Sequence, residues 1–172
     1  MKNAFCLVLL SAAVAALCGC GANYTWRSGT PEAMRTVSVP TMRNESAVTE
    51  LGAIATRQLL REFQREGTFK IRSTGDAALE IQGVIKSATA MVGAYSRRGG
   101  LRAASYDYEA KAEISVIDKR SRKVLIDNRS YTAQAVFTAE QDLTTAQRDA
   151  SGRLAEDLAR QVVDDVVNLK WE

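Results

Sequence analysis

The sequence contains no histidine, and this absence removes several large classes of enzyme from consideration. A Ser-His-Asp triad, a Cys-His dyad, a histidine-ligated zinc or haem and an imidazole general base all depend on that side chain. The sequence also has no Ser-x-x-Lys, G-x-S-x-G, G-x-G-x-x-G or P-loop pattern, so nucleophiles and phosphate-binding loops of those types are missing. We therefore predict no catalytic residue and no cofactor.

Cysteine is confined to the first twenty positions of the chain. Cys6, Cys18 and Cys20 lie in or beside one apolar run, and nothing farther along the chain could complete a disulfide or a cysteine metal cage with them. Because histidine is missing as well, we predict no metal site.

Acidic residues leave one enzymatic alternative, a hydrolase that uses carboxylates alone. Asp107, Glu109 and Glu113 alternate along one stretch, but Lys111 lies among them. We interpret this group as an exposed strand face with neutralising cross-strand partners. The adjacent pair Asp164-Asp165 falls on a predicted helix, where neighbouring side chains point about 100° apart, and we interpret it as a solvated surface.

The composition fits one globular domain. A chain of 172 residues that is 46% hydrophobic and 25% charged can bury about two-thirds of the surface that it exposes when unfolded, and it is not disordered by composition. The net charge of +3 is too small to indicate nucleic-acid binding, which requires a dense basic stripe. We therefore expect no nucleic-acid partner.

The first nineteen residues have the pattern of an export signal. Lys2 gives a positive start, and residues 4–17 are uncharged and rich in Ala, Leu and Val. This run is too short for a permanent membrane helix, which needs about twenty residues. It ends in Leu17-Cys18-Gly19-Cys20, which resembles the bacterial lipobox. The resemblance implies cleavage before Cys20 and acylation of Cys20. Because Gly21 rather than Asp follows, it also implies sorting to the outer membrane. An ordinary signal peptide is the alternative.

The next segment predicts a tether, a short strand and a helix. Residues 20–34 are polar and show no period, so we assign them to the acylated N-terminus and a flexible tether. Residues 36–39 alternate and end at a proline, which predicts a first strand. Apolar residues then recur every four positions up to Gly67, which suits the position after a helix end. Ser46 or Thr49 is the expected N-cap of this helix.

Alternating hydrophobicity predicts three consecutive strands in the middle of the chain. Residues 79–85 place apolar side chains on one face, and residues 106–116 alternate strictly. The segment from Ser96 to Arg102 contains two glycines and should connect them as a long hairpin. A second tight turn leads to residues 124–137, where a slip in the alternation predicts a β-bulge.

A long helix should end the chain. Thr144-x-x-Gln147 matches a capping box, and two rows of apolar residues then recur every four positions. The order strand, helix, three strands, helix predicts an α+β domain over residues 35–172. We expect a two-layer sandwich in which a four-stranded, mainly antiparallel sheet has two helices packed on one face.

Two turns carry clusters of basic residues. Arg97, Arg98 and Arg102 crowd the glycine-rich hairpin end, and four cations crowd the turn at residues 119–123. One interpretation is that solvated turns simply attract charge. The functional interpretation is that a guanidinium group binds phosphate bidentately and stays charged at any relevant pH. For a chain anchored to the outer membrane, the abundant phosphorylated ligand is lipopolysaccharide (LPS), whose lipid A carries phosphates beside acyl chains.

An ordered set of sequence pieces also resembles one known family. After the lipobox come RTVSVPTMRNES at 35–46, LLREFQREG at 59–67, ALEIQG at 78–83, YSRR at 95–98, YDY at 106–108, DKRSRKV at 118–124 and LAEDLA at 154–159. This set covers nearly all of residues 17–169 and resembles the LptE family of LPS-assembly lipoproteins.

The resemblance implies a two-helix, four-stranded domain that sits as a plug inside a large LptD-like β-barrel, assists its assembly and helps deliver LPS to the outer leaflet. In the family, LPS contact is ascribed to basic residues in the hairpin after the second strand and near the start of the last helix. By position, these are Arg97 or Arg98, with Arg102 on the same hairpin, and Arg148. The sequence departs from the family in that the aromatic residue after Cys-Gly is displaced to Tyr24.

A rival interpretation comes from a different class of protein. The chain would then be a structural or pilot outer-membrane lipoprotein that serves another secretion barrel or the cell wall and binds no LPS. The protein that co-purifies with the chain distinguishes the two interpretations.

Overall fold

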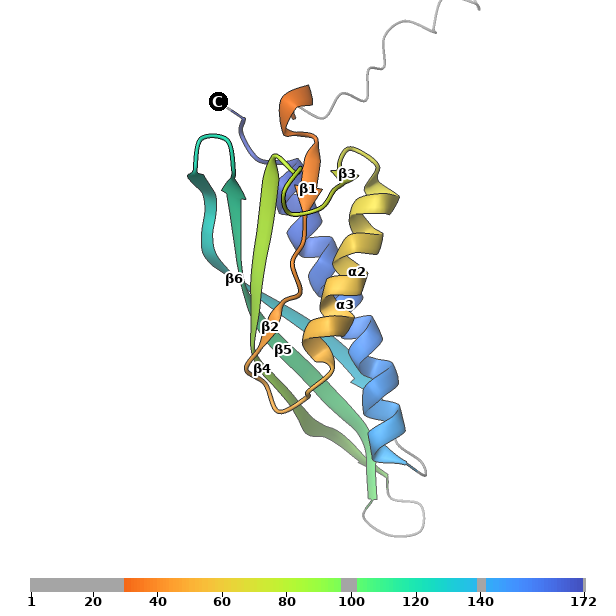
Figure 1. Cartoon of the computed structure of the whole chain (residues 1–172). Helices are drawn as coiled ribbons and strands as arrows, with labels where there is room; N and C mark the ends of the chain where they lie inside the picture. Colours follow the sequence, from red (N-terminus) through yellow and green to blue (C-terminus); the bar gives the residue numbers. More distant parts are fainter. Residues whose placement is uncertain (1–29, 97–101, 139–141, 172) are drawn as a thin grey trace, which may run out of the picture.

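A computed structural model describes residues 30–96, 102–138 and 142–171, which form one sheet with two long helices (Figure 1). None of the helices in this part of the chain has the length and apolar character needed to cross a membrane. In chain order, the elements are η2 Glu32–Met34, β1 Thr36–Ser38, β2 Arg43–Asn44, α2 Leu51–Glu66, β3 Lys70–Ile71, β4 Leu79–Ser96, β5 Arg102–Asp118, β6 Lys123–Phe137 and α3 Leu143–Val167.

The sheet has six strands and mixed pairing. Its order is β3-β1-β4-β5-β6, and β2 pairs with β4 outside this path. Strands β4, β5 and β6 form the predicted antiparallel meander, whereas β1, β2 and β3 pair in parallel. The parallel pairing of β1 with β4 arises because the chain crosses over through α2 between them. The prediction of a four-stranded, mainly antiparallel sheet is therefore wrong for one side of the sheet. Strands β2 and β3 have two residues each, which is too short for a detectable period.

Strand β5 provides the central row of the core. Tyr108, Ala110, Ala112, Ile114 and Val116 are all buried, so the predicted alternation is confirmed. The predicted bulge in β6 is confirmed as well: the β5 partners shift register between Ile114 and Val116, opposite a residue with a positive φ of 39° at Asn128.

Helix α2 buries the residues that its spacing predicted, but its N-cap differs. Leu51, Ala55, Leu59 and Phe63 are buried, and Gly67 closes the helix with φ 84°. The N-cap is Glu50, which has helical dihedral angles and makes no side-chain cap bond. Neither predicted cap is used. The Ser46 hydroxyl instead donates to the Asn44 side chain, 2.7 Å away, in the turn before the helix.

Helix α3 has 25 residues and begins earlier than its capping box predicted. The carboxylate of Asp142 accepts hydrogen bonds from the backbone N–H groups of Thr144 and Thr145. A carboxylate at this position satisfies two donors and is favoured by the helix dipole. Thr144 therefore lies inside the helix rather than at its cap.

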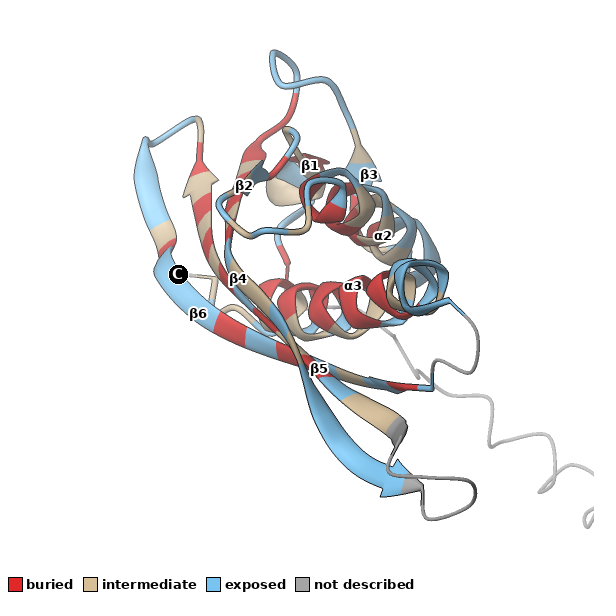
Figure 2. Ribbon diagram, turned by 90° about the horizontal axis from the view of Figure 1, so that it is seen from below, coloured by how far each residue is buried: buried red, intermediate tan, exposed pale blue. Residues whose placement is uncertain are grey.

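The two helices cover one face of the sheet, as predicted. They do not cover the far part of the β4–β5 hairpin, so one end of the sheet is more exposed than the rest. Figure 2 shows buried residues on the helix surfaces that face the sheet, and exposed residues along the far part of the β4–β5 hairpin. We call that hairpin end, together with the start of α3, the tip. We call the opposite end, where β1, β4 and β6 begin and β5 ends, the basal end.

Candidate functional site

The predicted hairpin of β4 and β5 is present, and its end belongs to the tip. Ser96 pairs with Arg102, so β4 and β5 stay antiparallel neighbours up to the connection. Arg97 and Arg98 lie outside the described residues, and for Arg102 the structure describes the backbone as the first residue of β5. Arg148 comes from the second turn of α3, and Figure 1 places the start of α3 at the same end of the molecule as the hairpin. The structure thus brings the two predicted regions to one end.

Large apolar side chains are exposed on the strands of the tip. Met91 is 62% exposed, Tyr95 59% and Val136 62%. Met91 and Val136 both pair with Asp107 and therefore lie in one row across the sheet. Exposed apolar groups that gather in one region mark interaction sites. Sequence reasoning missed these side chains. They are exposed because β4 continues through Ser96, beyond the part of the sheet that the helices cover.

A cavity of about 420 Å³ lies where both helices begin, beside the middle of β4. Its lining combines apolar side chains, such as Val48 and Ile54, with polar ones from α3. Across it, the Arg148 Nε atom is 3.9 Å from the Glu50 Oε2 atom, and these side chains are 66% and 67% exposed. A pair this exposed contributes at most about 1 kcal/mol, so Arg148 keeps a solvated charge. The contact with Glu50 has no sequence signal, because the two residues are far apart in the chain.

The start of α3 holds Arg148 on a well-defined turn. The Thr145 hydroxyl and the backbone N–H groups of Thr144 and Thr145 hydrogen-bond to Asp142 and hold the pKa of its carboxyl below the usual value, and the charge of Arg148 acts in the same direction. An ionised Asp142 is the form that caps the helix. The cap therefore fixes the first turn of α3, and Arg148 projects from the next turn.

On the acidic strand face, Glu109 has an uncharged partner across the strands and a charged partner on its own strand, rather than the predicted neutralising cross-strand pairs. Glu109 accepts a hydrogen bond from the Gln134 amide at 3.1 Å, and the Lys111 Nζ atom is 3.6 Å from its Oε1 atom. Among the residues that the structure describes, no group of three or more acidic side chains is placed to hold a metal ion. This face is an exposed polar surface.

Asp165 is partly exposed, with 38% of its side chain accessible, but it also has partners that the interpretation of Asp164-Asp165 as a solvated surface did not include. Its carboxylate accepts hydrogen bonds from Arg129 at 2.6 Å and from the Tyr131 hydroxyl at 2.8 Å. Burial, with the hydrogen bond to Asp165, raises the pKa of Tyr131 to about 12. Partial burial opposes ionisation of Asp165, but the bonds from Arg129 and Tyr131 hold its pKa below the usual value. Asp165 thus links α3 to β6.

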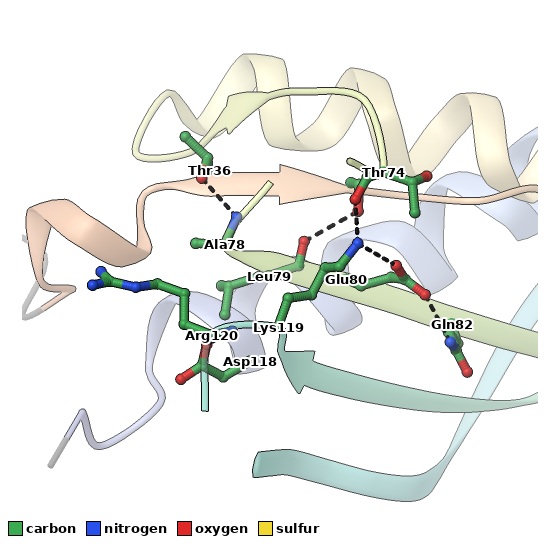
Figure 3. A network of polar contacts seen from close by, with 10 residues as sticks. Thr36, Thr74, Ala78, Leu79, Glu80, Gln82, Asp118, Lys119 and Arg120 are labelled. Atoms are coloured by element: carbon green, nitrogen blue, oxygen red, sulfur yellow. Dashed lines mark hydrogen bonds and ion pairs between the residues drawn. The ribbon is translucent and has the colours of Figure 1, made fainter. Parts of the chain in front are cut away.

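The second basic cluster lies at the basal end, on a turn with its own hydrogen bonds. Buried Asp118 accepts from the Ser121 hydroxyl at 2.6 Å and from the Arg120 backbone N–H at 2.9 Å. The Ser121 bond and the backbone bonds lower the pKa of Asp118. Lys119 turns inward, 3.3 Å from Glu80, and donates to the Thr74 carbonyl. Figure 3 shows the Arg120 side chain directed away from this network.

Arg122 adopts a left-handed backbone conformation in the same turn, with φ 58°. A side chain with a Cβ atom costs about 1–2 kcal/mol in this region of backbone space, where Gly or Asn is the usual residue. Arg120, Arg122 and Lys123 are exposed, and none of them forms an ion pair with a carboxylate in the described part of the chain. The turn thus presents three solvated cations.

A family model described as "LptE: Lipopolysaccharide-assembly" matches residues 34–166, more than half of the chain. The chain belongs to the LptE family. The match spans the β4–β5 hairpin, the turn between β5 and β6 at residues 118–123, which we call the basal turn, and most of α3. The LptE family resemblance of the sequence is thereby confirmed, and with it a role in LPS assembly. Among curated proteins, none matches this sequence.

Solved structures share the fold of this LptE-family chain at low sequence identity. CT253 from Chlamydia trachomatis has a TM-score of 0.55 at 12% identity, with 78% of this chain and 96% of that chain covered. XCC0632 from Xanthomonas campestris has a TM-score of 0.53 at 8% identity, covering 80% and 88%. A minor lipoprotein from Acinetobacter baumannii has a TM-score of 0.50 at 12% identity, covering 78% and 93%. These similarities support the two-layer α+β fold.

Proposed function

We propose that this LptE-family chain is a non-enzymatic outer-membrane lipoprotein, anchored through Cys20, that plugs an LptD-like barrel and binds LPS. In this role it assists assembly of the barrel and insertion of LPS into the outer leaflet. The family match over residues 34–166 is the observation that carries the proposal. The predicted lipobox ending at Cys20 supports the anchor. Acylation there would attach several acyl chains to one residue, and stable attachment requires more than one chain.

The chemistry of the tip supports direct LPS binding. Lipid A combines phosphates with acyl chains, so its site needs cations beside apolar surface. The sequence places Arg97, Arg98 and Arg102 at the connection between β4 and β5, and the side chains of Met91 and Tyr95 are exposed on the same β4 strand. Arginine is suited to phosphate because its planar guanidinium group makes two parallel hydrogen bonds. Arg148 adds a solvated cation at the same end of the molecule.

The outer face of the sheet supports a position inside a barrel. Glu109 and Lys111 lie on this face, opposite the helices, and bond to each other or to Gln134 rather than to an apolar layer. The interior of a membrane β-barrel is polar. The middle of the uncovered face, around Glu109 and Lys111, can therefore lie against such an interior, while Met91 and Val136, in one row with Asp107 on the same face, add exposed apolar surface toward the tip.

Co-purification tests the partner. The chain is extracted from producing cells in detergent, and the proteins that remain bound to it are identified. We expect an LPS-assembly barrel in stoichiometric amount. Recovery of a different secretion barrel, with no LPS-assembly barrel, would contradict the proposal and favour a pilot lipoprotein.

Charge reversal tests the LPS site. In the double variant Arg97→Glu/Arg98→Glu, LPS affinity should fall at least about tenfold, because charged hydrogen bonds contribute about 1.5–3 kcal/mol each. The matched control is Arg57→Glu/Arg61→Glu, which changes the charge equally on the exposed side of α2. Unchanged LPS affinity in a folded Arg97→Glu/Arg98→Glu variant would contradict the assignment.

A further inference from the structure

We propose that the basal turn is a second binding surface, whose partner is the anionic headgroup layer of a phospholipid membrane. Its contact residues are Arg120, Arg122 and Lys123, which we call the basal cations. The inference deepens the proposed function, since it rests on membrane anchoring through Cys20. It assigns a contact to the end of the molecule opposite the tip.

The basal cations are held outward by the fold of the turn. Asp118 is 5% exposed and accepts hydrogen bonds from the Ser121 hydroxyl and the Arg120 backbone N–H. The Lys119 backbone N–H donates to the Ala78 carbonyl at 2.9 Å, which joins the turn to the start of β4. The two acidic groups that bond to the turn are therefore already engaged, Asp118 within the turn and Glu80 with Lys119. Cations on a fixed turn lose little conformational freedom when they bind a charged surface.

The basal end is also where the chain enters the domain. One row of paired residues crosses the sheet here, from Val37 on β1 through Leu79 on β4 and Asp118 on β5 to Lys123 on β6. Adjacent strands lie about 4.8 Å apart, which places β1 about 10 Å from β5. Residues 20–29 separate Cys20 from the described chain, and a ten-residue segment spans at most about 35 Å. An anchored membrane surface is therefore within reach of the basal cations.

The charge of the two ends favours the basal end for a phospholipid surface. Lys70, at the start of β3, adds a further exposed cation there. Arg72 is exposed there as well, so the cations of the basal end outnumber its exposed acids, Glu32 and Asp76. At the tip, the described residues include the exposed acids Asp107, Asp142 and Asp149. A cluster of cations beside an anionic membrane is attracted by its surface potential, and each cation near the surface shifts the binding equilibrium about fivefold.

The test measures which end of the anchored protein lies against the membrane. The chain is isolated from producing cells in detergent, and mass spectrometry of its N-terminus establishes whether Cys20 carries lipid. A fluorophore is attached at Thr74→Cys, in the exposed turn beside the basal cations, or at Thr89→Cys, on β4 toward the tip. Each labelled protein is reconstituted into phosphatidylcholine vesicles, with or without phosphatidylglycerol, that carry a headgroup quencher.

We expect quenching at Thr74→Cys that requires phosphatidylglycerol and is reversed by salt, with none at Thr89→Cys. The variant Arg120→Glu/Lys123→Glu should shift the equilibrium away from the membrane by at least about twenty-five-fold, about fivefold for each cation removed, and the added negative charges act in the same direction. Arg57→Glu/Arg61→Glu, with the same charge change, should leave it unchanged. Quenching that is insensitive to phosphatidylglycerol, or to Arg120→Glu/Lys123→Glu in a folded protein, would overturn the proposal. Quenching that requires a co-purifying barrel but no anionic lipid would also overturn it, in favour of a protein contact.

A failure of the anchor would be distinguishable from a failure of the basal surface. If mass spectrometry finds Cys20 unmodified, the anchoring part of the proposed function is wrong. The basal cations are then tested by co-sedimentation of the same protein with phosphatidylglycerol vesicles. Binding that disappears in Arg120→Glu/Lys123→Glu would support the surface by itself, and binding that persists in that variant would overturn it.

Discussion

The two ends of the sheet expose different chemistry, although both are closed by turns that contain several cations. At the basal end, Asp118 and its partners fix the turn, and its exposed side chains are mainly cations, with Ser121 among them and Val124, 48% exposed, directly after them. At the tip, β4 and β5 extend past the helices, so apolar side chains such as Met91 and Tyr95 remain exposed beside the arginine hairpin. A cationic surface fits a headgroup layer, and a mixed surface fits a molecule with phosphates and acyl chains. The cations alone therefore do not specify the ligand. The side chains beside them decide whether a surface fits a headgroup layer or a molecule with phosphates and acyl chains.

The largest effect should come from removing the core beneath the basal end. Phe63 is fully buried and packs edge-on against Phe69, with their ring centroids 5.6 Å apart. Phe63→Ala should reduce the free energy of unfolding by about 4 kcal/mol, measured by urea denaturation. Phe137→Ala, near the tip, should cost less, about 3 kcal/mol, because the Tyr106 ring stacked on Phe137 is itself partly exposed. Equal losses would show that the tip is packed as tightly as the base.

The second largest effect should come from removing the carboxylate that holds the basal turn in place. Asp118→Ala removes two hydrogen bonds to a buried carboxylate and should cost about 2 kcal/mol of unfolding free energy. Because hydrogen bonds lower the pKa of Asp118 in the folded protein, its contribution should be fully present above about pH 4 and should decline as the pH falls below that value. Denaturation of the wild type and of Asp118→Asn at several pH values measures this. A stability difference that grows in acid would contradict the account.

A smaller effect is expected at the start of α3, where the tip holds Arg148. Asp142→Ala removes the side-chain cap and should cost about 1 kcal/mol, measured by thermal or urea denaturation. The matched control is Glu50→Ala at the corresponding position of α2, where the side chain makes no cap bond, and its cost should be close to zero. A larger cost for Glu50→Ala than for Asp142→Ala would mean that the contact between Glu50 and Arg148 matters more than the cap.

The regular part of this fold was predictable from the sequence. The strict alternation from Tyr108 to Val116 specifies β5 and its buried face, and the spacing up to Gly67 specifies α2 and its end. These elements are long enough for a period to repeat several times. The family resemblance carried by the ordered sequence pieces was predictable for the same reason, because it rests on many positions.

The remainder depends on contacts between distant parts of the chain. Strands β2 and β3 exist because β4 and β1 provide partners for them, and two residues have no period of their own. The caps were mistaken because Ser46 bonds within the preceding turn and because Asp142 lies two residues before the predicted cap. The approach of Glu50 to Arg148 likewise requires both helices to be in place.

LPS affinity, measured on two reciprocal charge reversals, tests most directly whether the two ends have different ligands. Arg97→Glu/Arg98→Glu changes the tip and Arg120→Glu/Lys123→Glu changes the basal end, with the same change in net charge. We predict that the tip variant loses at least about tenfold in affinity for LPS, while the basal variant stays close to the wild type. Equal losses in both variants, or a loss in the basal variant alone, would contradict the account.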